Sequence, residues 1–295
     1  MARSPSTESF EPAGFDVRQF ARTAHGSLRD DLDLASLAET PLPAEVRAEL
    51  AALAVLEGAT MAQLRNVLVT HTHKDARVTA FLVTWAFEKF WIADALRAIV
   101  DASAGPSGGE AAGGGAAPGP IPPAGDAAQF PDPDPQRAAS GGRGPVRRAF
   151  AGFTQGWAVV GAHMALGLVD DLVLGAAYTR VAECSADAAL HAAVERIVAV
   201  KRRHTRFFDE EVRRRLPTSG RTARLARREV RRTTWPLGSA ALTVDERRGF
   251  ARFTFGGVDG LGLAADLERA IAALPGIDAR TAAVVLQGLA GRRAA

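Results

Sequence analysis

One stretch decides how the chain is organised. Residues 105–145 read GPSGGEAAGGGAAPGPIPPAGDAAQFPDPDPQRAASGGRGP, and they hold 11 of the 29 glycines and nine of the 16 prolines. Segments of Gly, Pro, Ala and Ser bury too little apolar surface to offset the entropy lost on folding. We therefore predict a disordered connection over residues 101–148 that separates two structured parts of the chain.

Each structured part is predicted to form a pair of helices. Apolar residues recur every three or four positions in four long segments that are rich in helix-forming residues. These segments are Thr40–Thr70, Asp75–Val100, Ala149–Glu183 and Ser185–Leu216. The joins within each pair, at 71–75 and around Cys184, are short, so each pair must fold back as an antiparallel hairpin. The hairpins are thus expected over residues 40–100 and 149–217.

A long connection between two hairpins favours one topology. It allows the second and third helices of a four-helix bundle to run parallel, because a linker of about 45 residues easily spans a helix about 42 Å long. We predict an all-α protein in which residues 1–39 precede this bundle and residues 218–295 form a C-terminal helical extension. In the extension, a capping box at Thr243–Glu246 begins a helix, Leu261–Leu274 forms an amphipathic helix, and the glycine-rich 256–262 forms a turn between them.

Composition limits the class of protein. Of the 295 residues, 47% are hydrophobic and 23% charged, which excludes global disorder. The single cysteine, Cys184, excludes a disulfide framework and points to the cytoplasm. The most apolar stretch, Trp157–Tyr178, is interrupted by His163, Asp170 and Asp171, so we expect no membrane span.

Two glutamates lie where a helix should present leucines. Glu57 falls on the apolar stripe of the first helix, and Glu88 falls on that of the second. The first stripe comprises Val46, Leu50, Leu53, Met61, Leu64 and Leu68, and the second Phe81, Trp85, Ile92 and Ile99. A buried carboxylate without a partner costs several kcal/mol. Both glutamates therefore need a cation or a shared proton.

The register of the hairpins brings these groups to one level. Glu57 and Glu88 are 31 residues apart and are centred on the first turn, and Asp170 and Lys201 are 31 apart and are centred on the second. Residues equally far from a hairpin turn face each other. We therefore expect a single polar layer in the bundle.

Carboxylates on two hairpins, with His204 on the fourth helix, resemble the ferritin-like superfamily of di-iron carboxylate proteins, which includes rubrerythrins, acyl-carrier-protein desaturases and tRNA-hydroxylase-like proteins. The resemblance covers about residues 40–216 without the linker. It implies that Glu57, Glu88 and His204 match metal ligands of that family. It also implies a ferritin-like four-helix bundle and, in the metal-loaded members, an iron-dependent oxygenase or hydroxylase chemistry.

The chain departs from the family pattern at three ligand positions. Trp91 stands where the family has the histidine of the first Glu-x-x-His motif, Asp170 or Asp171 replaces the third-helix glutamate, and Lys201 replaces the bridging glutamate before His204. An ammonium group beside two metal ions is repelled by them. We therefore predict a degenerate site in which Lys201 substitutes for metal among Glu57, Glu88, Asp170 or Asp171, and His204.

The expected function depends on whether lysine or a metal ion neutralises these carboxylates. We expect a protein with a structural or binding role and no metal. The alternative is a non-haem iron oxygenase, acting on tRNA or a lipid-like substrate, in which the same residues hold iron or manganese. Because helical bundles often pair, we also keep a homodimer as an expectation.

Other candidate residues are given ordinary structural interpretations. His71 and His73 are predicted to lie in a solvated loop, His163 to be a satisfied core histidine, and His191 with Glu195 to be a surface pair. Cys184 is predicted to be a small buried residue.

Basic residues are concentrated from Arg196 to Arg232, where 14 Lys and Arg face four acidic residues. Arg221, Arg224, Arg228 and Arg231 share one helix face that could contact phosphate, with Trp235 as a stacking candidate. Nucleic-acid binding is thus an alternative, and we favour a solvated helix face over it.

Overall fold

We describe residues 14–104 and 156–291 of a computed structural model of the chain. The described part contains helices and no strands, which confirms the predicted all-α class. The α-helices are α1 Val17–Arg22, α2 Leu34–Glu39, α3 Ala44–Gly58, α4 Thr60–Leu68, α5 Ala76–Ala102, α8 Ala158–Glu183, α9 Ala188–Arg215, α10 Gly220–Arg232, α11 Val244–Phe255, α12 Gly257–Ala272 and α13 Ala279–Leu289.

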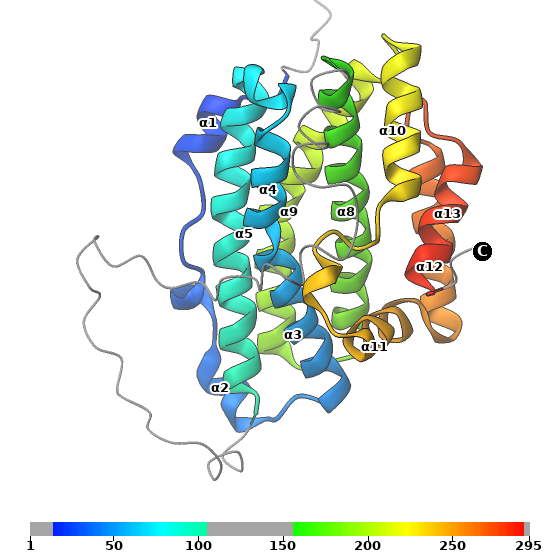
Figure 1. The fold of residues 1–295 in the computed structure, drawn as a ribbon. Coiled ribbons are helices and arrows are strands. Elements are labelled where there is room, and N and C mark those ends of the chain that lie inside the picture. Colours follow the sequence, from blue (N-terminus) through cyan, green and yellow to red (C-terminus); the bar gives the residue numbers. More distant parts are fainter. Residues whose placement is uncertain (1–13, 105–155, 292–295) are drawn as a thin grey trace, which may run out of the picture.

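The long helices lie side by side (Figure 1). One hairpin pairs α3 and α4 with α5, the other pairs α8 with α9, and the hairpins meet through α3 against α8 and α5 against α9. The predicted crossover falls almost entirely on residues outside the described part of the chain. Around this centre, α1 and α2 cover α5, while α10 and α12 pack on α8 and α11 packs on α3 and α8.

Side-chain caps begin the helices close to the predicted positions. Asp75 accepts the backbone N–H of Val78 at the start of α5, and Asp187 accepts that of Leu190 at the start of α9. Thr243 and Glu246 form the predicted capping box of α11. The predicted start of the third helix at Ala149 lies outside the described residues.

The first predicted helix is divided in the structure. The chain forms α3 and α4 with a break at Ala59, so the prediction of one continuous helix over Thr40–Thr70 was wrong. Gly58 weakens helix propagation at this point. As a result Met61, predicted to be on the apolar stripe, is 47% exposed. The glycine-rich 256–262 was predicted to be a turn, but α12 already begins at Gly257.

Among the described residues, α8 alone is long and apolar enough to cross a membrane, and 83% of its most apolar window is buried by the rest of the protein. A buried core helix passes the same test of length and composition.

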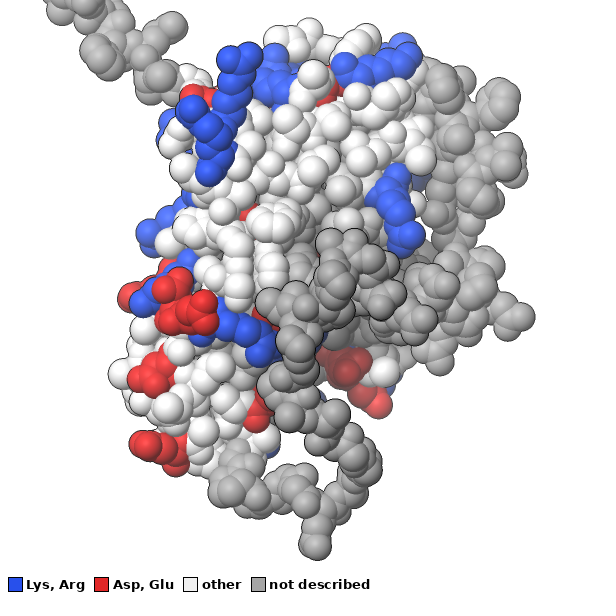
Figure 2. Space-filling model, turned by 90° about the vertical axis from the view of Figure 1, so that its left-hand side faces the viewer, with Lys and Arg blue, Asp and Glu red and all other residues white. Residues whose placement is uncertain are grey.

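Charge is unevenly distributed on the face where α1, α2 and α5 lie. Figure 2 shows acidic side chains mostly in its lower half and basic ones along its upper edge, with further basic side chains at mid-height and beside the acidic ones.

Candidate functional site

Five charged side chains form an alternating row in the interior where α3, α5, α8 and α9 meet. Their order is Asp171, Lys201, Glu57, Lys89 and Asp170. Lys201 Nζ lies 2.7 Å from Asp171 Oδ1 and 3.0 Å from Glu57 Oε1. Lys89 Nζ lies 2.8 Å from Glu57 Oε2 and 3.8 Å from Asp170 Oδ2. All five side chains are buried, and we call this set the ion chain.

Glu57 is the centre of the ion chain. Each of its carboxylate oxygens faces a lysine ammonium, and the Tyr178 hydroxyl donates a hydrogen bond to Oε1 at 3.0 Å. Burial raises the pKa of Glu57, but Lys201 and Lys89 together outweigh burial and hold this pKa at about 2. Glu57 is therefore ionised, and its charge is balanced from both sides.

The two ends of the ion chain are closed by hydrogen bonds. The backbone N–H of Leu237 donates to Asp170 Oδ1 at 2.7 Å, and the Thr205 hydroxyl donates to Asp171 Oδ2. Leu237 belongs to the segment between α10 and α11. The C-terminal extension thus takes part in satisfying the buried charges.

The ion chain carries one surplus negative charge when every group is ionised, because three carboxylates face two ammonium groups. Burial raises the pKa of Asp170 to about 6, although Lys89 and the Leu237 N–H oppose this shift. Burial lowers the pKa of Lys201, but Asp171 and Glu57 outweigh burial and raise this pKa above its ordinary value. The proton that neutralises the surplus therefore binds most readily at Asp170.

Glu88 and His204 form a second, adjacent buried pair. His204 Nε2 lies 2.7 Å from Glu88 Oε2, and the other carboxylate oxygen accepts the backbone N–H of His25 at 2.8 Å and lies 3.3 Å from Arg203. Burial lowers the pKa of His204, and Glu88 opposes that shift. Residues of the N-terminal segment thus cover this pair, with Arg203 also donating to the Thr23 carbonyl at 2.9 Å.

The structure brings most of the predicted site residues together. Glu57, Asp170, Asp171 and Lys201 share the ion chain, with Lys201 between Glu57 and Asp171. Glu88 and His204 contact each other instead of Glu57. In both hairpins the contact differs by one residue from the equal-distance expectation. Lys89 faces Glu57 where Glu88 was expected, and Asp171 faces Lys201 where Asp170 was expected.

Sequence reasoning missed Lys89, although two signals point to it. Lys89 continues the spacing of Trp85, Ile92, Leu96 and Ile99, which are all buried. The chain also uses arginine for 33 of its 36 basic residues, and the lysines are Lys74, Lys89 and Lys201. Two of the three lysines are therefore in the ion chain, where a compact ammonium with three rotatable donors fits between carboxylates.

The residues present do not fit a dimetal centre. Within residues 14–104 and 156–291, no three His, Cys, Asp or Glu side chains are arranged to hold a metal ion. Both oxygens of Glu57 are engaged by ammonium groups, so a cation could bind there only by displacing two positive charges.

His163 and His191 make contacts at hydrogen-bond distance within the protein, and Cys184 is half-buried. His163 Nδ1 lies 2.8 Å from the Thr72 hydroxyl, and burial lowers its pKa to about 4, as expected for a satisfied core histidine. The predicted surface pair of His191 and Glu195 was wrong, because His191 Nε2 contacts the carbonyls of Ala182 and Ser185 at the end of α8. Burial also raises the pKa of the half-buried Cys184 thiol.

The predicted basic face lies on α10. Arg221, Arg224 and Arg228 are exposed, and Arg231 is half-buried. Trp235, predicted as an exposed stacking residue, is buried and donates its indole N–H to the Val230 carbonyl at 3.1 Å. The aromatic side chain closest in sequence to this face therefore packs inside the protein.

The chain was compared with protein-family models, curated proteins and solved structures, and none of the three comparisons gave a match.

Proposed function

We propose that the protein is a ferritin-like helical bundle in which lysines replace the metal pair, and that it has a metal-independent structural or binding role. One observation carries this proposal: a lysine ammonium lies on each oxygen of the central carboxylate, at 2.8 Å from Lys89 and 3.0 Å from Lys201. Lys201 occupies a position at which the resemblance would place a metal ligand, and both lysines supply Glu57 with positive charge that a metal ion would otherwise bring.

The ferritin-like part of the proposal rests on the arrangement of the helices. Two hairpins are joined by a long connection, and each of α3, α5, α8 and α9 contributes a charged side chain to one interior cluster. In metal-containing bundles, inward-facing side chains of the helices likewise converge on one site.

The ion chain suits a role in specifying the packing of the two hairpins. Exchanging a buried ion pair for apolar residues often costs little, whereas removing one partner is strongly destabilising. Because the alternating charges come from four helices, any shift in helix register that leaves one of them without its partner would destabilise the bundle. This is a positioning role for the ion chain, and it leaves no coordination position open for oxygen chemistry.

The alternative of an iron-dependent oxygenase has weaker support. It requires carboxylates and His204 to converge with Lys201 turned away, whereas Lys201 lies between Glu57 and Asp171.

The proposal is tested by attempting to restore a metal site. Lys201→Glu recreates a Glu-x-x-His motif with His204, and Lys89→Gln removes the second ammonium. Calorimetric titration with Fe(II) or Mn(II) under anaerobic conditions should show no binding to the wild type and binding to the K89Q/K201E double variant. The matched control is K89Q/K201Q, which removes the same charges without adding a carboxylate and should bind no metal.

Stoichiometric binding to the wild type, abolished by Glu57→Gln, would overturn the proposal. This outcome does not depend on the folding of the double variant. Circular dichroism of each variant establishes that its helices are retained.

A further inference from the structure

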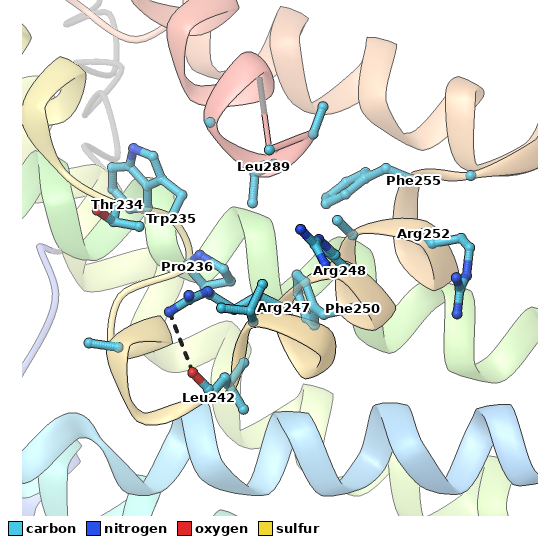
Figure 3. Close-up of a pocket in the computed structure, with 17 residues that line it drawn as sticks. Thr234, Trp235, Pro236, Leu242, Arg247, Arg248, Phe250, Arg252, Phe255 and Leu289 are labelled. Carbon is cyan, nitrogen blue, oxygen red and sulfur yellow. Dashed lines mark hydrogen bonds between the residues drawn. The ribbon is translucent and has the colours of Figure 1, made fainter. Parts of the chain in front are cut away.

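A cavity lies in the C-terminal extension, and no residue of the ion chain lines it. It has a volume of about 760 Å³ and is bounded by the segment after α10, by α11 and by the end of α13 (Figure 3). Small-molecule sites typically occupy about 300–1,000 Å³. The cavity is therefore large enough for a ligand of metabolite size.

The cavity has an apolar wall that is already formed. Trp235 and Leu289 face it from one side, and Phe250 and Phe255 face it from α11 (Figure 3). Trp235, Phe250 and Leu289 border the cavity and are each no more than 6% exposed, and the Trp235 indole is held by its hydrogen bond to the Val230 carbonyl. Rigid aromatic walls of this kind bind apolar groups at a low entropic cost.

The charged residues that line the cavity in the described part of the chain are all arginines. Among the residues that the structure describes, its lining includes Arg247, Arg248 and Arg252 and no Asp or Glu. Arg247 is anchored by hydrogen bonds from Nη1 to the carbonyls of Ser239 and Leu242, at 3.1 and 3.4 Å. Such anchoring fixes the guanidinium next to the apolar wall and leaves its other N–H groups available to an anion.

Arg248 supplies a second, adaptable positive charge. It lies between Arg247 and Leu289 in Figure 3, whereas Arg252 extends away from them. Its ion pair with Asp245 is 3.3 Å long and joins side chains that are 75% and 93% exposed. Exposed pairs of this kind contribute little, so a bound anion can compete for the Arg248 guanidinium.

We propose that this cavity binds an amphipathic carboxylate whose apolar body lies against Trp235, Phe250 and Leu289 and whose head group pairs with Arg247 and Arg248. Apolar walls with a few convergent polar groups are typical of ligand sites, and guanidinium groups match the geometry of a carboxylate. The proposal goes beyond the proposed function, because none of the residues that bind the carboxylate belongs to the ion chain.

The test is titration of the full chain with dodecanoate below its micelle concentration, followed by tryptophan fluorescence and calorimetry. We expect saturable binding of one dodecanoate per chain. Dodecanol, which lacks the charge, should bind at least tenfold more weakly, because hydrogen bonds to charged groups contribute about 1.5–3 kcal/mol. Arg248→Ala should weaken dodecanoate binding about fivefold or more for the same reason.

A cavity-filling variant locates the binding. A Cβ atom on Gly288, which lines the cavity, would meet nothing within 4 Å, so Gly288→Leu is accommodated and should abolish binding. The matched controls are Gly262→Leu, whose Cβ is also unobstructed, and Arg269→Ala, which removes an exposed arginine paired three residues away with Asp266. Both controls should bind as the wild type does.

Three results would overturn the proposal. They are no saturable binding to the wild type, equal binding of dodecanol, or binding that persists unchanged in Gly288→Leu. Each leaves the proposed function of the ion chain unaffected, since that is tested by metal binding.

Discussion

At the scale of single residues, the protein depends on lysines whose charges are buried among carboxylates. Lys201 neutralises Glu57 and Asp171 at once. Without it, three buried carboxylates would face one ammonium group, and desolvation makes such an imbalance costly. The two buried lysines are therefore the residues at which a small change should have the largest effect on stability.

Lys201→Met should lower the free energy of unfolding by about 3–5 kcal/mol, the usual cost of removing one partner of a buried pair. Chemical denaturation followed by circular dichroism measures this loss. Lys74→Met is the control, because Lys74 is exposed and surface substitutions usually change stability by less than about 0.5 kcal/mol. Equal effects of the two substitutions would show that Lys201 does not carry the predicted electrostatic role.

A second residue-scale prediction concerns Glu49, a buried carboxyl on α3 that accepts a hydrogen bond from the Thr254 hydroxyl at 2.8 Å. Burial raises its pKa from the ordinary 4.5 to about 8, although Thr254 opposes the shift. The folded state thus holds a proton that the unfolded state releases above about pH 4.5. The contribution of Glu49 to stability is fully present below that pH and is lost as the pH rises toward 8.

Glu49→Gln should remove this pH dependence. Each pH unit between about 4.5 and 8 should cost the wild type up to about 1.4 kcal/mol through this group, so the variant should gain stability relative to the wild type across that range. Urea denaturation at pH 5 and pH 8 measures the difference. A wild type and variant whose stabilities change in parallel between these two pH values would contradict the prediction.

At the scale of elements, the register of the hairpins could be predicted to within one residue. Equal spacing from the turns indicated the level of the polar layer, and in both hairpins the observed contact lies one residue further along the chain, at Lys89 and at Asp171. One residue in a helix corresponds to a rotation of about 100°. Lys89 and Glu88 therefore point in directions about 100° apart, and Lys89 is the residue that faces Glu57.

Close approach of helices is a further element-scale feature. Gly167 on α8 permits it, because a Cβ there would lie 2.4 Å from the Phe208 ring of α9. The connection after α10 could not be anticipated from the sequence. Its contacts with Ala59 and Asp170 join residues far apart in the chain, and no local pattern encodes them.

Gly238 should tolerate no side chain in that connection. Its φ is +82°, and a Cβ would lie 2.5 Å from the Cβ of Ala59. Gly238→Ala should therefore destabilise the protein by about 1–3 kcal/mol through backbone strain and overpacking. Gly175→Ala on α8 is the matched control, because its Cβ meets nothing within 4 Å and alanine favours helix. A Gly238→Ala variant as stable as this control would contradict the packing of the connection on α3.

At the scale of the whole molecule, one hydrophobic core joins the N-terminal segment, the long helices and the C-terminal extension, from Phe15 to Leu289. Composition and periodicity sufficed to predict an all-helical protein. They could not predict how the extension packs, because Leu267, Ile271 and their neighbours could bury their apolar face against several surfaces.

The shared core predicts a single cooperative unfolding transition. Thermal melts followed by far-ultraviolet circular dichroism and by tryptophan fluorescence should have the same midpoint, since Trp235 lies in the extension and Trp85 in α5. Separate midpoints would show that the extension unfolds independently of the long helices.

The measurement that most directly tests whether lysines replace metal is the metal content of the wild-type protein, purified without chelator from cells supplied with iron and manganese. The ion chain predicts far less than one metal ion per chain and an unfolding midpoint that does not change when a chelator is added, because the buried carboxylates are already neutralised. Iron or manganese at one or two ions per chain, lost together with stability on chelation and absent from Glu57→Gln, would contradict this prediction.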